Sequence, residues 1–135
     1  MALIWKISGG AVAAMLAAVL LGAFSPSRER TVEITIHHSR FRPATVEVSP
    51  GTTVRFVLRN TDPIDHEFIL GDEEVQARHE AGTEAHHGAI PGEVSVPAGE
   101  EASTTYIFTE PGTLFIGCHL PGHYAYGMRG SVGVG

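Results

Sequence analysis

The stretch Gly117–Met128 reads GCHLPGHYAYGM, and the rest of the chain is best understood from it. It holds Cys118, the only cysteine, and Met128, the only methionine beyond the first fifteen residues. Four residues separate Cys118 from His123, and four more separate His123 from Met128. A single cysteine or methionine is most often core filler, but a loop rich in Gly and Pro is a poor place for core residues. Thiolate, imidazole and thioether are soft ligands that favour copper or zinc, so the loop predicts a metal site.

One ligand of a complete site is missing from this loop. Two histidines and one cysteine in a trigonal arrangement, with a weak axial methionine, form the blue-copper electron-transfer geometry. His66, at the start of the apolar run His66–Leu70, is the best candidate for the second histidine. We therefore expect His66, Cys118, His123 and Met128 to bind one copper ion. Four protein ligands leave no open position for a substrate, so we expect a carrier and no catalytic residues.

The region from about Thr31 to Gly135 resembles the cupredoxins, the family of plastocyanin, azurin and rusticyanin. The resemblance rests on the ligand loop and on an upstream histidine that begins a strand-like run. It implies a Greek-key β-sandwich in which His66, Cys118 and His123 bind copper equatorially and Met128 binds axially. The most similar group is the small bacterial periplasmic cupredoxins associated with copper handling, which pair a His-Glu-Phe strand with a Cys-x₄-His-Tyr loop ending in Gly-Met.

The first thirty residues differ in kind from the rest. Lys6 precedes Ile7–Phe24, an uncharged run of 18 residues, and a polar break follows at Ser25–Arg30. This layout is typical of a secretory signal. The run is also at the short limit of a bilayer span, so an uncleaved membrane anchor remains open. We expect residues 1–30 to be a signal peptide or anchor, and residues 31–135 to be an exported domain on the periplasmic or extracytoplasmic side.

The net charge and the single cysteine limit the classes of function that this domain can have. From Thr31 onward there are six Arg and no Lys against fourteen Asp and Glu, a net charge of about −8 with histidine neutral. Nucleic-acid binding requires a basic face, so we expect no nucleic-acid partner. A single cysteine in an exported domain cannot form an internal disulfide and requires an explanation. Metal ligation is one, because it occupies the thiolate.

Short apolar runs with period two predict an all-β domain. Val32, Ile34 and Ile36 alternate with polar residues, and Val54, Phe56 and Leu58 do the same. The expected strands are Thr31–His37, Thr45–Val48, Thr52–Asn60, His66–Leu70, Glu93–Val96, Ala102–Phe108, Thr113–Cys118 and Arg129–Val134. Phe41–Pro43 is expected to break the first strand. Strands at this spacing are typical of a β-sandwich or barrel.

The segment 71–92 interrupts this pattern. Asp72 is expected to cap a short helix that Gly82 ends, and an irregular loop is expected over Thr83–Gly92. The histidines of this segment, His79, His86 and His87, lie near Glu80 and Glu84, and imidazole with carboxylate can bind Cu(II) or Zn(II). A solvated polar loop is the slightly favoured interpretation. His37 and His38 are expected to point to opposite faces of a strand and to be solvent-facing.

His119 raises the alternative of a multicopper oxidase, in which histidines flank the type 1 cysteine on both sides. Gly117 occupies the preceding position, and the sequence has no His-x-His pair. A dinuclear copper centre needs two cysteines and is excluded because the sequence has one. We expect His119 to lie beside the site without ligating it.

Two functions remain open from the sequence. The first is a one-electron carrier, expected to be a monomer, that docks a redox partner around His123. The resemblance implies an apolar docking patch there, and the flanking residues are Leu120, Pro121, Tyr124 and Tyr126. The second is copper sequestration or delivery in copper resistance, with the 71–92 segment as an auxiliary site.

Overall fold

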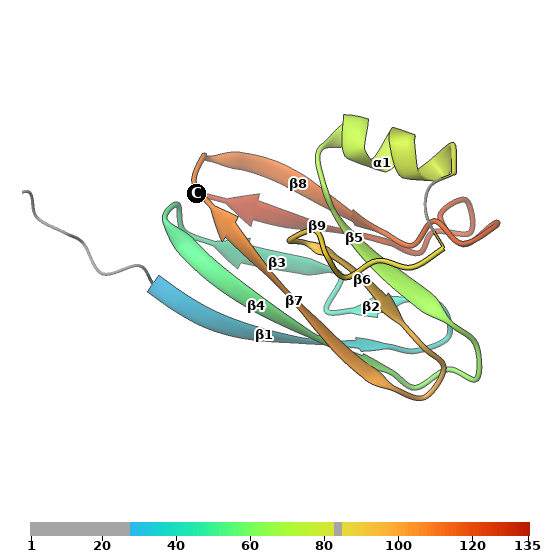
Figure 1. Ribbon diagram of the computed structural model, residues 1–135. Helices are drawn as coiled ribbons and strands as arrows, with labels where there is room; N and C mark the ends of the chain where they lie inside the picture. The colour runs from blue at the N-terminus through green and yellow to red at the C-terminus, as the bar shows by residue number, and fades with distance from the viewer. Residues whose placement is uncertain (1–27, 83–84) are drawn as a thin grey trace, which may run out of the picture.

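The computed structural model describes residues 28–82 and 85–135, which form two β-sheets packed face to face with one short helix (Figure 1). The elements are β1 (Arg28–Ile36), β2 (Phe41–Arg42), β3 (Thr45–Val48), β4 (Thr52–Asn60), β5 (His66–Gly71), α1 (Glu73–Glu80), β6 (Glu93–Val96), β7 (Glu101–Phe108), β8 (Gly112–Gly117) and β9 (Arg129–Val134). The sheet orders are β2-β1-β4-β7 and β3-β9-β8-β5-β6. Both sheets are mixed, because β1 pairs with β4 and β3 pairs with β9 in parallel while the other pairs are antiparallel.

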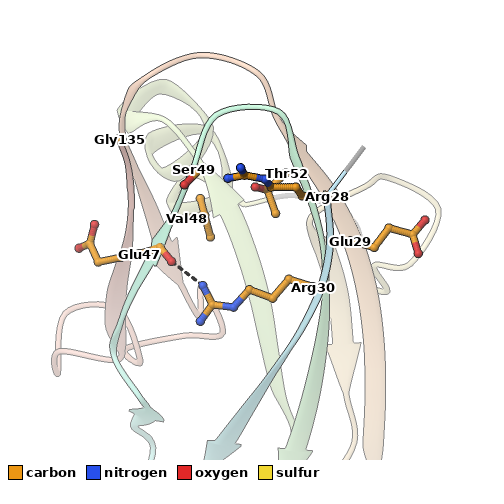
Figure 2. A pocket seen from close by; sticks show the side chains of 8 residues that line it. All are labelled: Arg28, Glu29, Arg30, Glu47, Val48, Ser49, Thr52 and Gly135. Atoms are coloured by element: carbon orange, nitrogen blue, oxygen red, sulfur yellow. Dashed lines mark hydrogen bonds between the residues drawn. The ribbon is translucent and has the colours of Figure 1, made fainter. Parts of the chain in front are cut away.

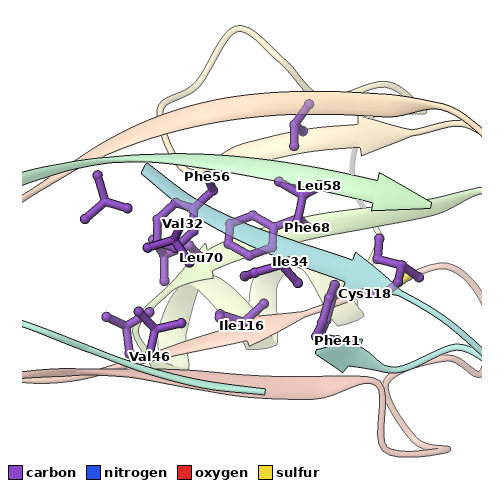
Figure 3. Packing of buried hydrophobic residues seen from close by; sticks show 14 of the residues in the cluster. Val32, Ile34, Phe41, Val46, Phe56, Leu58, Phe68, Leu70, Ile116 and Cys118 are labelled. Atoms are coloured by element: carbon purple, nitrogen blue, oxygen red, sulfur yellow. The ribbon is translucent and has the colours of Figure 1, made fainter. Parts of the chain in front are cut away.

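The predicted alternation of apolar and polar residues is confirmed in β1 and β4. Their inward apolar side chains are buried, and the outward Arg55 and Arg59 are exposed. Phe56 lies 5.1 Å from Phe68 of the facing sheet, measured between ring centroids, so the core is made by side chains of both sheets (Figure 3). Cys118 belongs to this buried cluster. One end of the core therefore merges with the predicted metal site.

Two expectations about the first turn were wrong. Phe41–Arg42 does not merely break a strand; it forms β2, which pairs antiparallel with the end of β1. His37 and His38 do not lie on opposite faces of a strand, since their rings stack with centroids 3.9 Å apart. The cause is the backbone, because His38 and Ser39 have positive φ values of 50° and 51° and turn the chain sharply after β1.

The predicted short helix is confirmed as α1. The Asp72 side chain accepts a hydrogen bond of 2.9 Å from the Val75 N–H and so caps the helix. The chain leaves the helix through Gly82, whose φ of 101° suits glycine. The helix contacts β5 and β8. No helix within the described ranges is long and apolar enough to span a bilayer, and the predicted leader Ile7–Phe24 lies outside those ranges.

The two ends of the sandwich differ in chemistry. Strand β9 begins beside the ligand loop and runs to the C-terminus at the other end (Figure 1). That far end carries a pocket lined by Arg28, Arg30, Glu47 and Gly135, among others (Figure 2). The Arg30 guanidinium donates a hydrogen bond to the Glu47 carbonyl there. This pocket contains no histidine or cysteine, so it is not a site for a soft metal ion.

Candidate metal centre

Neighbouring strands bring the predicted ligands together. His66 is the first residue of β5, and Cys118 follows directly after β8. These two strands pair antiparallel, with Ile69 opposite Gly117, so the start of β5 lies beside the end of β8. His123 and Met128 follow on the loop that connects β8 to β9. A strand pair thus supplies two donors and a single loop supplies the others.

Three donor atoms converge at this point. The His66 Nδ1 and His123 Nδ1 atoms are 3.2 Å apart, and the Cys118 Sγ atom lies 3.3 Å from His123 Nδ1 and 3.9 Å from His66 Nδ1. First-row ions bind imidazole at about 2.0 Å and thiolate at about 2.3 Å, which separates donors on one ion by roughly 3.3–3.8 Å. The observed spacing fits one ion shared by all three. His66 and Cys118 are buried, and His123 is half-buried.

The ligand loop is held closed by its own backbone. The Cys118 N–H donates to the Met128 carbonyl at 3.2 Å, and the Met128 N–H donates to the His123 carbonyl at 3.0 Å. Met128 is fully buried although it lies on a short loop. Gly127, with a φ of 93°, allows the turn that precedes Met128. These backbone hydrogen bonds therefore hold Met128 next to Cys118.

Asp62 is a residue of the candidate site that sequence reasoning missed. It is buried, and its carboxylate accepts hydrogen bonds from His38 N–H (2.7 Å), Ser39 N–H (2.8 Å) and His66 Nε2–H (2.9 Å). The last bond fixes the proton on Nε2 and leaves the Nδ1 lone pair of His66 for a metal. A carboxylate behind a metal-binding histidine is a common orienting arrangement. Its position four residues before His66 in a turn was the available signal.

Burial sets the protonation of the site without metal. Desolvation raises the pKa of Cys118 to about 11, although a hydrogen bond of 3.4 Å from the Glu67 N–H to Sγ opposes it. Desolvation and the neighbouring His66 lower the pKa of His123. For Asp62, burial would raise the pKa, but the hydrogen bonds from Ser39, His38 and His66 outweigh it and lower the pKa. The imidazole of His123 can therefore bind a metal at neutral pH as it stands, whereas the thiol of Cys118 must first lose a proton.

His119 lies beside the site and faces away from it. Its ring nitrogens contact Glu80 Oε2 and Gln76 Oε1, each at 2.7 Å, and its ring stacks on Tyr124. Gly117 is buried, and a Cβ atom at this position would lie 2.6 Å from Gln76 Oε1. A histidine at this position, as the oxidase pattern requires, would therefore force the side chains of Gln76, His119 and Tyr124 to move.

The histidines of the 71–92 segment separate into two groups. His79 and His87 come together with Glu93, and their donor atoms lie within 4.8 Å of one another. His86 is exposed and is not part of this group, while Glu80 contacts His119 and Glu84 lies outside the described residues. The expectation of a solvated polar loop is therefore wrong for His79 and His87. Glu93, which begins β6, was not recognised as a partner because it follows the loop in sequence.

Comparison with known proteins agrees with this geometry. The family model described as copper binding proteins of the plastocyanin/azurin family matches residues 29–135. The structure of dithionite-reduced auracyanin from Roseiflexus castenholzii is 25% identical, with a TM-score of 0.66, and the match covers 78% of this chain and 96% of that one.

Curated relatives carry the name "Copper-resistant cuproprotein CopI". The protein from Rubrivivax gelatinosus is 40% identical over 109 residues, which cover 77% of this chain and 66% of the relative, just under two thirds of its length. The protein from Pseudomonas aeruginosa is 31% identical over 137 residues, covering 78% of this chain and 76% of the relative. With the family match spanning most of its length, the chain belongs to the plastocyanin/azurin family of copper-binding proteins and is a cupredoxin close to the copper-resistance cuproproteins.

Proposed function

We propose that this protein binds copper outside the cytoplasm and serves in copper resistance, with His66, Cys118 and His123 as equatorial ligands and Met128 as the axial ligand of a type 1 centre. The observation that carries the proposal is the convergence of two imidazole nitrogens and one cysteine sulfur within 3.9 Å. The names of the relatives at 40% and 31% identity favour copper resistance over other uses of such a centre. The predicted leader supports an extracytoplasmic location.

The residues around the site prepare it to hold copper tightly. Asp62 orients His66, Glu67 donates to the Cys118 sulfur, and the backbone of the ligand loop fixes Met128. Bound copper supplies a Cu(II)/Cu(I) couple, and its potential depends on the axial ligand and on the polarity around the sulfur. Because the ligands are buried in a closed frame, we expect slow exchange of the metal. We infer a binding protein and not an enzyme.

A one-electron carrier is the second candidate. The side chains near His123 favour a carrier function, since Pro121 is exposed and Tyr126 is 79% exposed. Together with Leu120 and Tyr124 they would give a redox partner an apolar surface beside His123, the ligand histidine that is half-buried. This arrangement implies docking of a protein at the end of the sandwich that carries the ligand loop.

Growth of a deletion strain on copper tests the resistance function. Complementation with the parent gene should restore growth, and Cys118→Ser should fail at equal protein abundance. Equal growth with both would contradict the proposal. The carrier function predicts instead that the visible band bleaches and returns reversibly with a physiological electron donor. Loss of that electron exchange in Tyr126→Asp with intact copper resistance would show that the two functions are separate.

A further inference from the structure

A second group of side chains of the types that bind metals lies next to the proposed type 1 ligands. It consists of His79 from α1, His87 from the following loop and Glu93 from β6. Their side chains are only 4%, 1% and 7% exposed. Charged and imidazole groups are rarely buried to this degree unless they are paired or bind metal. The burial therefore calls for a chemical explanation.

The distance from Glu93 to each histidine matches that between two donors on one bound ion. The Glu93 Oε2 atom lies 3.3 Å from His79 Nε2 and 3.2 Å from His87 Nδ1. Imidazole nitrogen and carboxylate oxygen bind first-row ions at about 2.0–2.2 Å, which separates donors on one ion by roughly 3.2–3.6 Å. Glu93 is therefore already placed to share an ion with either histidine, and all three donor atoms lie within 4.8 Å of one another.

The hydrogen bonds around the histidines leave lone pairs directed at the proposed ion. His79 Nδ1 lies 2.8 Å from the Val75 carbonyl, to which it can only donate, so the neutral ring presents a lone pair on Nε2. His87 Nε2 is buried and has no hydrogen-bond partner, although Glu67 Oε2 is 3.3 Å away. If His87 Nδ1 binds a metal, Nε2 carries the proton and faces Glu67. Carboxylates commonly occupy this place behind metal-binding histidines.

We propose that His79 Nε2, His87 Nδ1 and Glu93 form a second metal site for a divalent transition-metal ion. Two imidazoles and one carboxylate bind zinc or copper, and Cu(II) binds most strongly among the divalent ions of this series. The site extends the proposed copper handling to a second ion, but its chemistry does not depend on that function. With three protein ligands, it leaves a coordination position open for water or an exchanging ligand.

Glu67 connects the two sites. Its backbone N–H donates to the Cys118 sulfur at 3.4 Å, and its Oε1 accepts a hydrogen bond from the His119 N–H at 2.9 Å. Its other carboxylate oxygen lies beside His87. An ion that draws His87 toward it changes the surroundings of Glu67, and through them the hydrogen bond to the copper-binding sulfur. We expect occupancy of the second site to shift the visible band of the type 1 centre.

Titration of the holoprotein with Cu(II) tests this proposal. Protein already loaded with one type 1 copper should bind a second equivalent that has no intense visible band and shows a type 2 EPR signal with coupling to two nitrogens. His87→Ala should lose the second equivalent and keep the blue band. His86→Ala is the matched control, because His86 is adjacent to His87 in the sequence but is exposed and lies outside the proposed site, and it should titrate like the parent. Identical titrations of the two variants, or a parent that binds one copper only, would overturn the proposal.

Two further measurements separate this site from the type 1 centre. Cys118→Ser should still bind one Cu(II) with the type 2 signal, so failure of the type 1 assignment leaves the second site visible. Glu93→Gln, a change of nearly equal size, should weaken that binding in the same background. If the cluster is instead a set of buried ion pairs, ¹⁵N NMR will show His79 and His87 protonated on both nitrogens even with excess Zn(II), and that result would refute the metal site.

Discussion

Replacing Asp62 by asparagine tests whether a residue that does not contact copper prepares the metal site. The Asp62 carboxylate accepts three hydrogen bonds, from His38 N–H, Ser39 N–H and His66 Nε2–H. The first two hold the turn after β1, whose residues His38 and Ser39 have positive φ. The third fixes the tautomer of His66. The substitution keeps the shape of the side chain and replaces one acceptor oxygen with an NH₂ donor.

The magnitude follows from these contacts. Oδ1 accepts from His38, while Oδ2 accepts from both Ser39 and His66. Whichever way the amide is turned, at least one N–H that is buried or part-buried faces the NH₂ group, at a cost of about 1–3 kcal/mol in the free energy of unfolding, with the lower end expected for a part-buried group. Loss of an orienting carboxylate typically weakens metal binding by about 10–100-fold. We expect both effects in Asp62→Asn.

Competition with a copper chelator measures the affinity, and chemical denaturation of the metal-free protein measures the stability. Asp65→Asn is the matched control, because Asp65 is exposed in the same loop and its carboxylate accepts one hydrogen bond, from the Ala98 N–H. The control should change copper affinity less than about threefold. Equal affinities for parent and Asp62→Asn would refute the role of Asp62 in preparing His66.

The same variant predicts a pH dependence of stability. The pKa of Asp62 is lowered below its usual 3.8 in the folded protein. A carboxyl with a depressed pKa stabilises the fold above the unfolded value, and this contribution disappears as the pH falls through the folded value. The difference in unfolding free energy between parent and Asp62→Asn should therefore decrease as the pH falls below about 3.8. A difference that grows toward acid would contradict this sign.

Three other predictions concern the ligand loop. Cys118→Ser should be colourless and bind little copper at the type 1 site, because thiolate provides the charge-transfer band; an intensely blue variant would exclude Cys118 as the ligand. Met128→Leu should keep the blue band and raise the reduction potential, measured by redox titration, since weak axial ligands tune potential; complete loss of copper binding would show that Met128 is not a weak ligand. Because the pKa of Cys118 is about 11, copper loading at pH 7 should release about one proton from the thiol, and the copper affinity should rise with pH. Calorimetry in buffers of different ionisation enthalpy measures the number of protons released. Copper binding without proton release would contradict this prediction.

Much of the fold could be predicted from local patterns. The alternation in Thr31–Ile36 and Thr52–Asn60 is set by one buried face, and the structure confirms it. The helix after Asp72 was also predictable, because its cap and terminal charges are local. β2 was missed, because two residues carry no periodicity and their pairing with β1 depends on the backbone turn at His38–Ser39.

The site shows the same division between local and long-range information. Three of the predicted ligands share one loop, so their spacing in the sequence already indicated a common ion. His66 lies on a distant strand that pairs with β8, and it was chosen because it begins an apolar run and completes the ligand set, a choice with which the resemblance to cupredoxins agrees. The roles of Asp62 and Glu93 depend on which side chains the folded chain places around them. Spacing in the sequence does not encode those contacts.

The visible and EPR spectra of the Cu(II)-loaded domain, recorded with a metal count, test the central claim most directly. The convergence of His66 Nδ1, His123 Nδ1 and Cys118 Sγ predicts an intense sulfur-to-copper band and the narrow copper hyperfine splitting of a type 1 centre for the first equivalent. A colourless first equivalent with the wide splitting of ordinary Cu(II) would show that Cys118 does not ligate the metal and would contradict the assignment.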